Sequence, residues 1–266
     1  MTESTGACGP AWSIAPEPAD VTSTSEPAKM HGTRNLRGGS TIRDVGRQPA
    51  YSVTEAARHL RLSPATLRSW VVGRNYTTHS GARRSRRLLQ PATADPITLS
   101  FWNLIEAHVL RALRTEHGVS APDLRAALDY AESQLGIADL LLRKDLQTEG
   151  GRVLLSRYGE LIDLSRSGQI AMRQVLNVHL KRVEWDETDF PIRLYPFLSA
   201  DDTGTDRVVS IDPRIAFGRP VVRGSGVSTR VIVDRLDVGE SVSDVAADYG
   251  LSERLIEQAV LYERAA

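Results

Sequence analysis

The hydrophobic residues between positions 51 and 71 recur at helical spacing and predict two helices joined by a tight turn. The apolar face of the first helix consists of Val53, Ala56, Ala57 and Leu60. Arg61 and Leu62 fill the turn, with Leu62 expected between the helices. Ser63 has the character of an N-cap and Pro64 that of a first helical residue, where a missing N–H is tolerated. The residues expected to pack back on the first helix are Leu67 and Trp70 or Val71.

The outward face of the second helix and the segment after it have the composition of a DNA contact. Outward positions, as on a recognition helix in the major groove, are Ala65, Thr66, Arg68 and Ser69. Residues 73–90 are polar, bounded by glycine and rich in arginine. Their length and composition suit a wing, a β-hairpin that lies along the phosphate backbone. A solvated loop is the alternative, but contiguity with the helix pair favours the wing.

Residues 48–98 are therefore expected to form a winged helix-turn-helix. Thr66, Arg68 and Ser69 are placed for base edges, although Arg68 is equally suited to a phosphate. Arginine binds phosphate and guanine through paired donors, which makes it fit for either contact. The candidate DNA-binding residues are Arg58, Arg61, Ser63, Thr66, Arg68, Ser69, Arg74, Arg83, Arg84, Arg86 and Arg87.

Charge is distributed unevenly along a chain whose formal net charge is zero. Residues 34–90 contain twelve arginines against two carboxylates, whereas residues 201–266 contain eight arginines against twelve carboxylates. One end is therefore expected to contact phosphates and the other end something else. Lysine is nearly absent, although genome base composition would produce the same bias toward arginine.

Residues 99–200 are expected to form a middle segment of helices and β-hairpins. Ser100 caps a helix with a broad apolar face, on which His108 is expected to be a packed or capping histidine and not a ligand. Ser120 begins a second helix, with Asp123 at the capping-box position and Gly136 after its end. The further expected elements are a hairpin across residues 152–164, a helix to about residue 181 and a hairpin across residues 183–195.

Residues 201–266 read as a linker, a β-hairpin and a three-helix domain. The expected strands cover residues 208–211 and 219–223, and the expected helices residues 229–236, 242–249 and 253–264. The last two helices again have helix-turn-helix form, but the final helix carries Glu253, Glu257 and Glu263. Phosphate repels an acidic helix, so this part is predicted to contact protein or to dimerise. The fold class is therefore α+β, mainly helical.

The N-terminal 47 residues are rich in Ser, Thr, Pro, Gly and Ala and are expected to be a disordered tail. The arginines of this segment are Arg34, Arg37, Arg43 and Arg47. One interpretation is a basic arm that reaches DNA, but a solvated tail is favoured. Cys8 is the single cysteine, so neither a disulfide nor a cysteine-based metal site is expected.

Neither a membrane segment nor catalysis is expected. No apolar run approaches the roughly 20 residues of a membrane helix, and no secretory signal is evident, so the expected compartment is the cytosol. The six histidines never fall at ligand spacing, and no nucleophile has a plausible base near it in sequence. We therefore expect no metal, no cofactor and no enzymatic activity.

Two stretches resemble known families. The stretch YSVTEAARHLRLSPATLRSWV resembles the N-terminal helix-turn-helix of MerR-type regulators, which runs Tyr, Ser or Thr, Glu-Ala, Ser-x-x-Thr-Leu-Arg and an aromatic residue. The stretch IDPRIAFGRPVVRGSGVSTRVIVDRLDVGESVSDVAADYGLSE closely resembles a small domain of unknown function. That domain occurs in VapB-type antitoxins whose toxins are PIN-like ribonucleases. Its Thr-Arg-Val-Pro is replaced here by Ser225-Gly226-Val227-Ser228, which loosens a turn and removes no chemistry.

The resemblance covers about residues 50–265 and implies an antitoxin that binds its toxin and represses its own operon. The expected operator-bound form is a homodimer that reads a two-fold repeat. Candidate toxin contacts, on the argument that arginine enters an acidic nuclease site, are Arg219, Arg223 and Arg230. The alternative is a MerR-like transcriptional regulator without a toxin, whose middle segment senses a small molecule.

Overall fold

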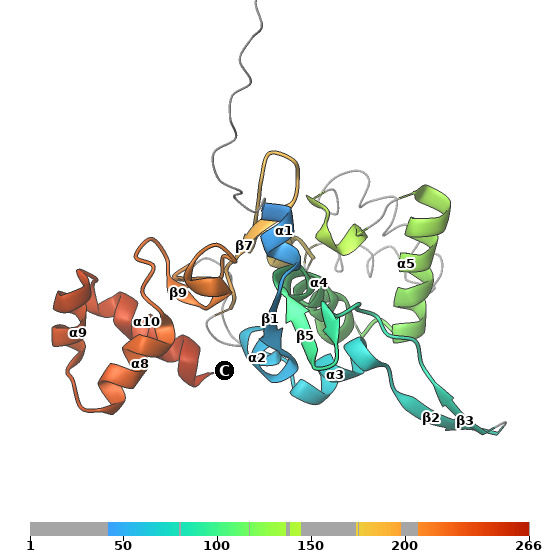
Figure 1. The fold of residues 1–266 in the computed structure, drawn as a ribbon, viewed down its shortest axis with the longest axis horizontal. Coiled ribbons are helices and arrows are strands. Elements are labelled where there is room, and N and C mark those ends of the chain that lie inside the picture. Colours follow the sequence, from blue (N-terminus) through green and yellow to red (C-terminus); the bar gives the residue numbers. More distant parts are fainter. Residues whose placement is uncertain are drawn as a thin grey trace, which may run out of the picture. The chain divides into compact units, whose positions relative to one another are not determined.

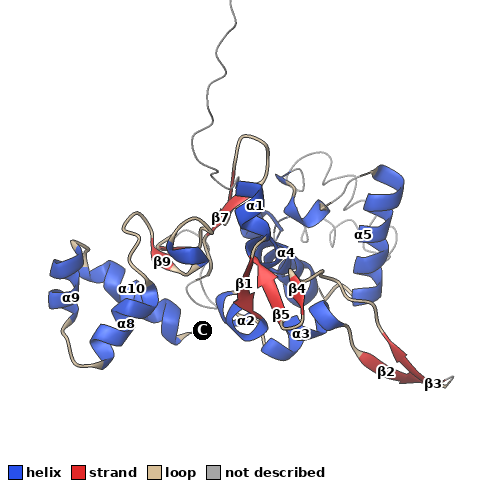
Figure 2. Ribbon diagram, viewed as in Figure 1, coloured by secondary structure: helices blue, strands red, loops and turns tan. Residues whose placement is uncertain are grey.

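A computed structural model describes residues 42–79, 81–116, 118–136, 139–144, 174, 176–197 and 207–265. The chain combines helices with small antiparallel sheets (Figures 1 and 2), as expected for an α+β protein. The described residues belong to one compact unit, Ser40–Ala266. The expected hairpin across residues 152–164 and the linker at residues 199–206 lie outside the described residues.

The N-terminal part of this unit alternates short helices and strands. In chain order they are α1 Ile42–Arg47, β1 Pro49–Ser52, α2 Val53–His59, α3 Pro64–Val72, β2 Asn75–Thr78, β3 Gly81–Arg84, β4 Thr93–Ala94 and β5 Ile97–Ser100. Strands β1, β5 and β4 form a three-stranded antiparallel sheet with β5 in the centre, and β2 pairs with β3 alone.

The remaining elements follow the order that the sequence predicts. They are α4 Phe101–Arg111, a π-helical turn Ala112–Glu116, α5 Ala121–Leu135, a 3-10 turn η2 Leu140–Leu142, β6 Val183–Trp185, β7 Pro191–Leu194, β8 Val209–Ser210, a 3-10 turn η4 Ala216–Gly218, β9 Val221–Val222, α8 Thr229–Asp237, α9 Val242–Tyr249 and α10 Glu253–Arg264. The two hairpins expected across residues 183–195 and 208–223 form, as β6 with β7 and β8 with β9. Residues 174 and 176–180 are helical, within the helix expected to end near residue 181.

The predicted helix starts are confirmed by their hydrogen bonds. The Ser63 hydroxyl accepts from the Thr66 N–H at 3.1 Å, and Ser100 forms a reciprocal capping box with Asn103. The hydroxyl oxygens of Ser120 and Ser241 accept from the N–H groups of Asp123 and Asp244 at the starts of α5 and α9. A serine oxygen satisfies an N–H that the first turn of a helix leaves without a partner, which is why a local pattern places these starts well.

The larger hydrophobic cluster contains residues from Tyr51 to Ile211, with α4 at its centre. Most residues of α4 are buried, and two of its polar side chains have partners: Asn103 Nδ2 donates to the Gln90 carbonyl at 2.8 Å, and His108 Nε2 lies 3.0 Å from the His179 carbonyl oxygen. His108 is thus the packed histidine that was predicted. Strand β5 spans residue 98, where the sequence places a domain boundary; it pairs with β1 and leads directly into α4.

Residues 42–47, which the sequence assigned to the disordered tail, form α1 instead. The helix packs against Trp102: a Cβ at Gly46 would lie 2.4 Å from the indole nitrogen, and the Arg47 guanidinium carbon lies 4.5 Å from the ring centroid. Composition missed this helix because its stability comes from a tryptophan more than fifty residues away in the sequence. The rest of the predicted tail lies outside the described residues.

Helices α8, α9 and α10 enclose a second hydrophobic cluster (Figure 1), centred on Val222, Ile232, Val245 and Ile256. Gly250 adopts the left-handed conformation that ends α9, as the sequence predicts. A bridge between Leu194 and Ile211 joins this C-terminal part to β7.

Candidate nucleic-acid interface

Helices α2 and α3 pack on each other around a buried apolar contact, as the sequence predicts. The Ser52 hydroxyl accepts from the Glu55 N–H at 3.1 Å and fixes the start of α2. Leu67, Trp70 and Val71 are buried on the inner face of α3. Arg61, in the turn, has a φ of 54°, a left-handed conformation that is uncommon for a residue with a side chain. The turn therefore depends on contacts beyond its own sequence.

The outer face of α3 presents one long basic side chain. Ala65 and Arg68 are exposed, whereas Thr66 and Ser69 are partly buried. The Ser69 hydroxyl donates to the Thr66 carbonyl at 2.7 Å, and the Thr66 and Ser63 hydroxyl oxygens lie 2.8 Å apart. A hydroxyl can both donate and accept, so Thr66 and Ser69 keep hydrogen-bonding capacity at the surface. Arg68 has the longest reach of this set.

The basic segment after α3 forms a hairpin whose stem is attached to the end of that helix. Asn75 pairs with Arg84 and Thr78 with Gly81, and Figure 1 shows β2 and β3 extending beyond α3. The Arg84 guanidinium donates to the Val72 carbonyl at 2.8 and 3.2 Å, where it satisfies the C-terminal end of α3. Gly73 has a φ of 86°, and a Cβ there would lie 2.2 Å from the Ser85 carbonyl oxygen.

The remaining basic residues of this segment lie on the hairpin or at its base. Arg74, Arg84, Arg86 and Arg87 are exposed, and the side chain of Arg83 lies outside the described residues. Arg86 forms an ion pair with Asp129 of α5 at 3.3 Å; both side chains are more than half exposed. Such a pair contributes little stability, so Arg86 can exchange this carboxylate for a phosphate at small cost.

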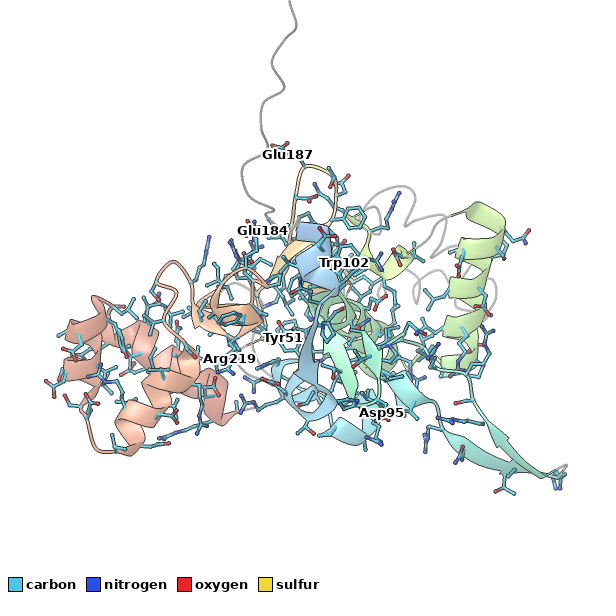
Figure 3. The ribbon with its side chains drawn as sticks, in the orientation of Figure 1. Tyr51, Asp95, Trp102, Glu184, Glu187 and Arg219 are labelled. Carbon is cyan, nitrogen blue, oxygen red and sulfur yellow. The ribbon has the colours of Figure 1, made fainter. Side chains whose placement is uncertain are left out.

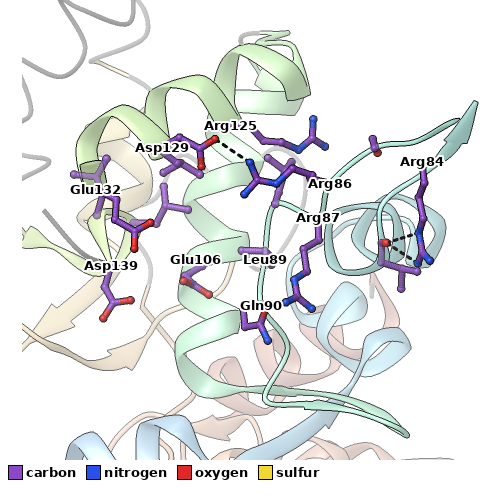
Figure 4. Close-up of a pocket in the computed structure, with 16 residues that line it drawn as sticks. Arg84, Arg86, Arg87, Leu89, Gln90, Glu106, Arg125, Asp129, Glu132 and Asp139 are labelled. Carbon is purple, nitrogen blue, oxygen red and sulfur yellow. Dashed lines mark hydrogen bonds and ion pairs between the residues drawn. The ribbon is translucent and has the colours of Figure 1, made fainter. Parts of the chain in front are cut away.

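A cavity of about 790 Å³ lies between the base of the hairpin, α4 and α5 (Figure 4). Figure 4 shows guanidinium groups on one side of it and carboxylates on the other, and the labelled charged residues are Arg84, Arg86, Arg87, Arg125, Glu106, Asp129, Glu132 and Asp139. Burial raises the pKa of Glu106 to about 7, while its hydrogen bond from Asn103 opposes this rise. The base of the hairpin therefore has mixed charge, and the basic character is concentrated on Arg74, Arg87 and the hairpin itself.

Two of the predicted DNA-binding residues contact the C-terminal helix. The Arg61 guanidinium donates to the Tyr262 carbonyl at 2.7 Å and lies 4.9 Å from the centroid of its ring. Arg58 lies 3.5 Å from the Glu263 carboxylate, which also accepts from the Thr229 hydroxyl at 2.6 Å. The sequence carries no local signal for these contacts, because the partners are about two hundred residues apart.

His59 occupies the centre of this α2–α10 contact. Its Nδ1 lies 2.9 Å from the Tyr262 hydroxyl oxygen, and both side chains are almost fully buried. Burial, followed by the charges of Arg58 and Arg61, lowers the pKa of His59 to about 3. A neutral imidazole is therefore part of the folded structure at neutral pH. Tyr51 makes a second long-range contact, donating its hydroxyl proton to the Gly218 carbonyl at 2.7 Å.

The candidate toxin contacts lie on the surface of the C-terminal part. Arg219 (Figure 3), Arg223 and Arg230 are all exposed. Arg230 pairs with Asp234 along α8 at 2.9 Å, and the Arg223 guanidinium carbon lies 5.5 Å from the Tyr195 ring centroid.

Asp212, which the sequence did not single out, is fully buried beneath this region. Its carboxylate binds Arg193 at 3.0 Å and Arg214 at 2.8 Å. Burial acts to raise the pKa of Asp212, but the hydrogen bonds and charge of the two arginines outweigh it and lower the pKa overall. This ion-pair cluster fixes the backbone where β8 ends.

The described residues contain neither a cluster of metal-ligating side chains nor a helix able to span a membrane. Within that part of the chain, no three His, Cys, Asp or Glu side chains come together in a way that could hold a metal ion. Likewise, none of the helices described has both the length and the apolar composition needed to cross a membrane.

Comparisons with known proteins agree with the resemblance of the C-terminal stretch. Residues 209–262 match the family described as "Protein of unknown function (DUF433)". A crystal structure of Rv2018 from Mycobacterium tuberculosis superposes with a TM-score of 0.59 over 80% of this chain and 98% of that chain, at 23% identity, which shows a shared fold. The Mycobacterium tuberculosis protein named "Putative antitoxin VapB45" is 31% identical over 224 residues, 77% of this chain and 89% of that protein. The chain belongs to the family of that VapB-type antitoxin.

Proposed function

We propose that this protein is an antitoxin that binds and neutralises a PIN-like ribonuclease toxin, and that it also binds operator DNA to regulate its own operon. The observation that carries the antitoxin role is the identity of 31% with a relative of that name over most of both chains. The role requires binding surfaces and no catalytic residue.

The DNA-binding part of the proposal rests on α2, α3 and the β2–β3 hairpin, taken together as a winged helix-turn-helix. An exposed Arg68 on α3 and an adjacent basic hairpin are the arrangement with which such motifs read a groove and hold the flanking phosphates. Ser63, Thr66, Arg68 and Ser69 are the residues we assign to the groove. A homodimer would place two copies of α3 on the halves of a two-fold operator.

The arginines predicted to contact phosphate form two groups, according to whether their side chains already bond to another residue of the folded chain. Arg74 and Arg87 are exposed on or beside the hairpin and are directly available. Arg58 and Arg61 contact Glu263 and Tyr262, so contact with phosphate would compete with these bonds. We therefore assign the main phosphate contacts to the hairpin side of α3.

Toxin binding is tested by co-expression with the neighbouring reading frame of the operon. We expect the two products to co-purify as a stable complex, and the ribonuclease activity of the isolated toxin to fall when this chain is added. The absence of a complex, or an unchanged ribonuclease rate, would refute the antitoxin role. It would leave a regulator without a toxin, a reading that none of the comparisons favours.

DNA binding is tested by gel shift with the operon's upstream region over a series of salt concentrations. The double variant Arg74→Ala/Arg87→Ala should bind all sequences more weakly, and the slope of log affinity against log salt should flatten by about 2 if both residues contact phosphate. The matched control is Arg230→Ala/Arg264→Ala, which removes the same charge from the exposed sides of α8 and α10. Equal slopes for the two double variants would contradict the wing assignment.

A further inference from the structure

Phe217 is the most exposed large hydrophobic residue in the described part of the chain, with 93% of its surface open to solvent. Other exposed apolar side chains are Val238 at 80%, Leu261 at 48%, Val231 at 45% and Val178 at 41%. Scattered small apolar residues are ordinary at protein surfaces, but a fully projecting phenyl ring is not. Phe217 also lies within residues 209–262, the part of the chain that matches the family described as DUF433.

The backbone that projects Phe217 adopts an unusual conformation. Ala216 and Phe217 have φ values of 48° and 56°, both in the left-handed region that residues with a Cβ seldom adopt. Two such residues in succession persist only where the surrounding structure holds them. The hydrogen bonds around them do so: the Gly218 N–H donates to the Ile215 carbonyl at 2.9 Å, and the Arg219 N–H donates to the Ala216 carbonyl at 3.1 Å.

Both ends of this turn are tied to the core. Before it, the Ile215 N–H donates to the carbonyl of the fully buried Asp212 at 2.9 Å. After it, the Gly218 carbonyl accepts from the Tyr51 hydroxyl at 2.7 Å. A Cβ on Gly218 would lie 2.3 Å from the hydroxyl oxygen of Tyr51. The phenyl ring is thus presented by a turn that is hydrogen-bonded at both ends, so binding through it would cost little ordering entropy.

The charged residues next to Phe217 in sequence have one sign at the surface. From position 213 to position 223 the only charged residues are Arg214, Arg219 and Arg223, all of them exposed. The nearest carboxylate before them, Asp212, is buried and pairs with Arg214, so Arg219 and Arg223 carry the positive charge that this carboxylate does not offset. An apolar anchor with basic neighbours is complementary to an apolar pocket with an acidic rim, and aromatic residues and arginine are the types most enriched among binding hot spots.

We propose that Phe217 is the anchor of the toxin-binding surface, and that it enters an apolar pocket with an acidic rim on the toxin. This inference rests on the proposed antitoxin function and specifies where on this chain the toxin docks. Arg219 and Arg223, which follow the anchor in sequence and are exposed, add positive charge to this part of the surface and accelerate association with the acidic rim.

The test measures the affinity of the full chain for its purified toxin by isothermal titration calorimetry. Phe217→Ala removes the ring and keeps a residue with a Cβ in the left-handed conformation, so the backbone is not relaxed as it would be by glycine. We expect the variant to bind on the order of 30-fold more weakly, as for a hot-spot residue. The matched control is Val238→Ala, which removes another highly exposed apolar side chain and should bind within about threefold of the unaltered chain.

The possible outcomes separate the inference from the function on which it rests. Equal affinity of the Phe217→Ala variant and the unaltered chain, with a complex formed by both, would refute the anchor and leave the antitoxin role standing. A change in the oligomeric state of the isolated chain, with toxin affinity unchanged, would assign Phe217 to a contact between copies and also refute it. An unaltered chain that binds no toxin would refute both. A melting temperature equal to that of the unaltered chain establishes that Phe217→Ala leaves the fold intact.

Discussion

Replacing His59 with asparagine is expected to remove a pH-dependent loss of stability that the unaltered chain suffers below pH 7. His59 is buried between α2 and α10, where burial, with the charges of Arg58 and Arg61, lowers its pKa to about 3. The unfolded chain takes up a proton near pH 6.5, whereas the folded chain does not. Stability is therefore fully present above pH 6.5 and is lost as the pH falls from 6.5 toward 3.

The magnitude follows from the two pKa values. With 6.5 in the unfolded chain and about 3 in the folded chain, His59 costs about 2 kcal/mol of unfolding free energy at pH 5 and almost nothing at pH 8. Any folded-state pKa below about 4 gives nearly the same loss, because the unfolded-state pKa then sets it. A loss of this size corresponds to a fall in melting temperature of about 4–8 °C.

The assay is urea unfolding of the unaltered chain and the His59→Asn variant at pH 8, 7, 6 and 5. Asparagine does not titrate, and its side-chain oxygen can accept from the Tyr262 hydroxyl in the place of Nδ1. The variant loses a pH-independent amount of stability through its smaller side chain, so the measured quantity is the change with pH. Titration of the buried His108 is common to both chains and cancels. Parallel stability curves between pH 8 and pH 5 would refute a neutral, buried His59.

Three further predictions concern stability. Tyr51→Phe should cost about 1–2 kcal/mol in urea unfolding, because the Gly218 carbonyl loses its partner; no measurable change would argue against that contact. Glu106→Gln should raise the free energy of unfolding by about 3 kcal/mol at pH 8 but not at pH 4. The reason is that the pKa of Glu106 is about 7 in the folded chain, so its carboxyl group lowers stability as the pH rises above 4.5. A stabilising effect at pH 4 and none at pH 8 would contradict a raised pKa for Glu106. Ser100→Ala should lower stability by about 1 kcal/mol by removing its half of the capping box with Asn103, and an unchanged melting temperature would contradict this.

Several features of the chain could be predicted because they depend on residues within one or two helical turns. Ser63, Ser100 and Ser120 each bond to an N–H three residues on, so a short window of sequence contains both partners. Helix α9 begins for the same reason at Ser241 and ends at Gly250, whereas α8 and α10 begin where predicted without a side-chain bond from Ser228 or Ser252. The outward face of α3 followed from the spacing of its apolar residues.

The predictions that differ from the structure all involve partners distant in sequence. Residues 42–47 form a helix because Gly46 allows the backbone to approach Trp102. Strand β5, which spans residue 98, likewise lies between β1 and β4 of its sheet before the chain enters α4. Composition reports the average tendency of a segment, and it contains no information about which surface that segment will meet.

The candidate binding surfaces likewise combine local features with contacts between residues that are distant in sequence. The helix pair, the basic hairpin segment and the acidic last helix could be predicted, since propensity, capping and charge are properties of the local residues. The contacts of Arg58, His59 and Arg61 with α10, and the turn that Tyr51 holds and from which Phe217 projects, arise only from tertiary packing. These bonds join groups 167 to more than 200 residues apart. Their geometry exists only once the hydrophobic clusters have formed and brought residues 51–61 next to residues 218–263.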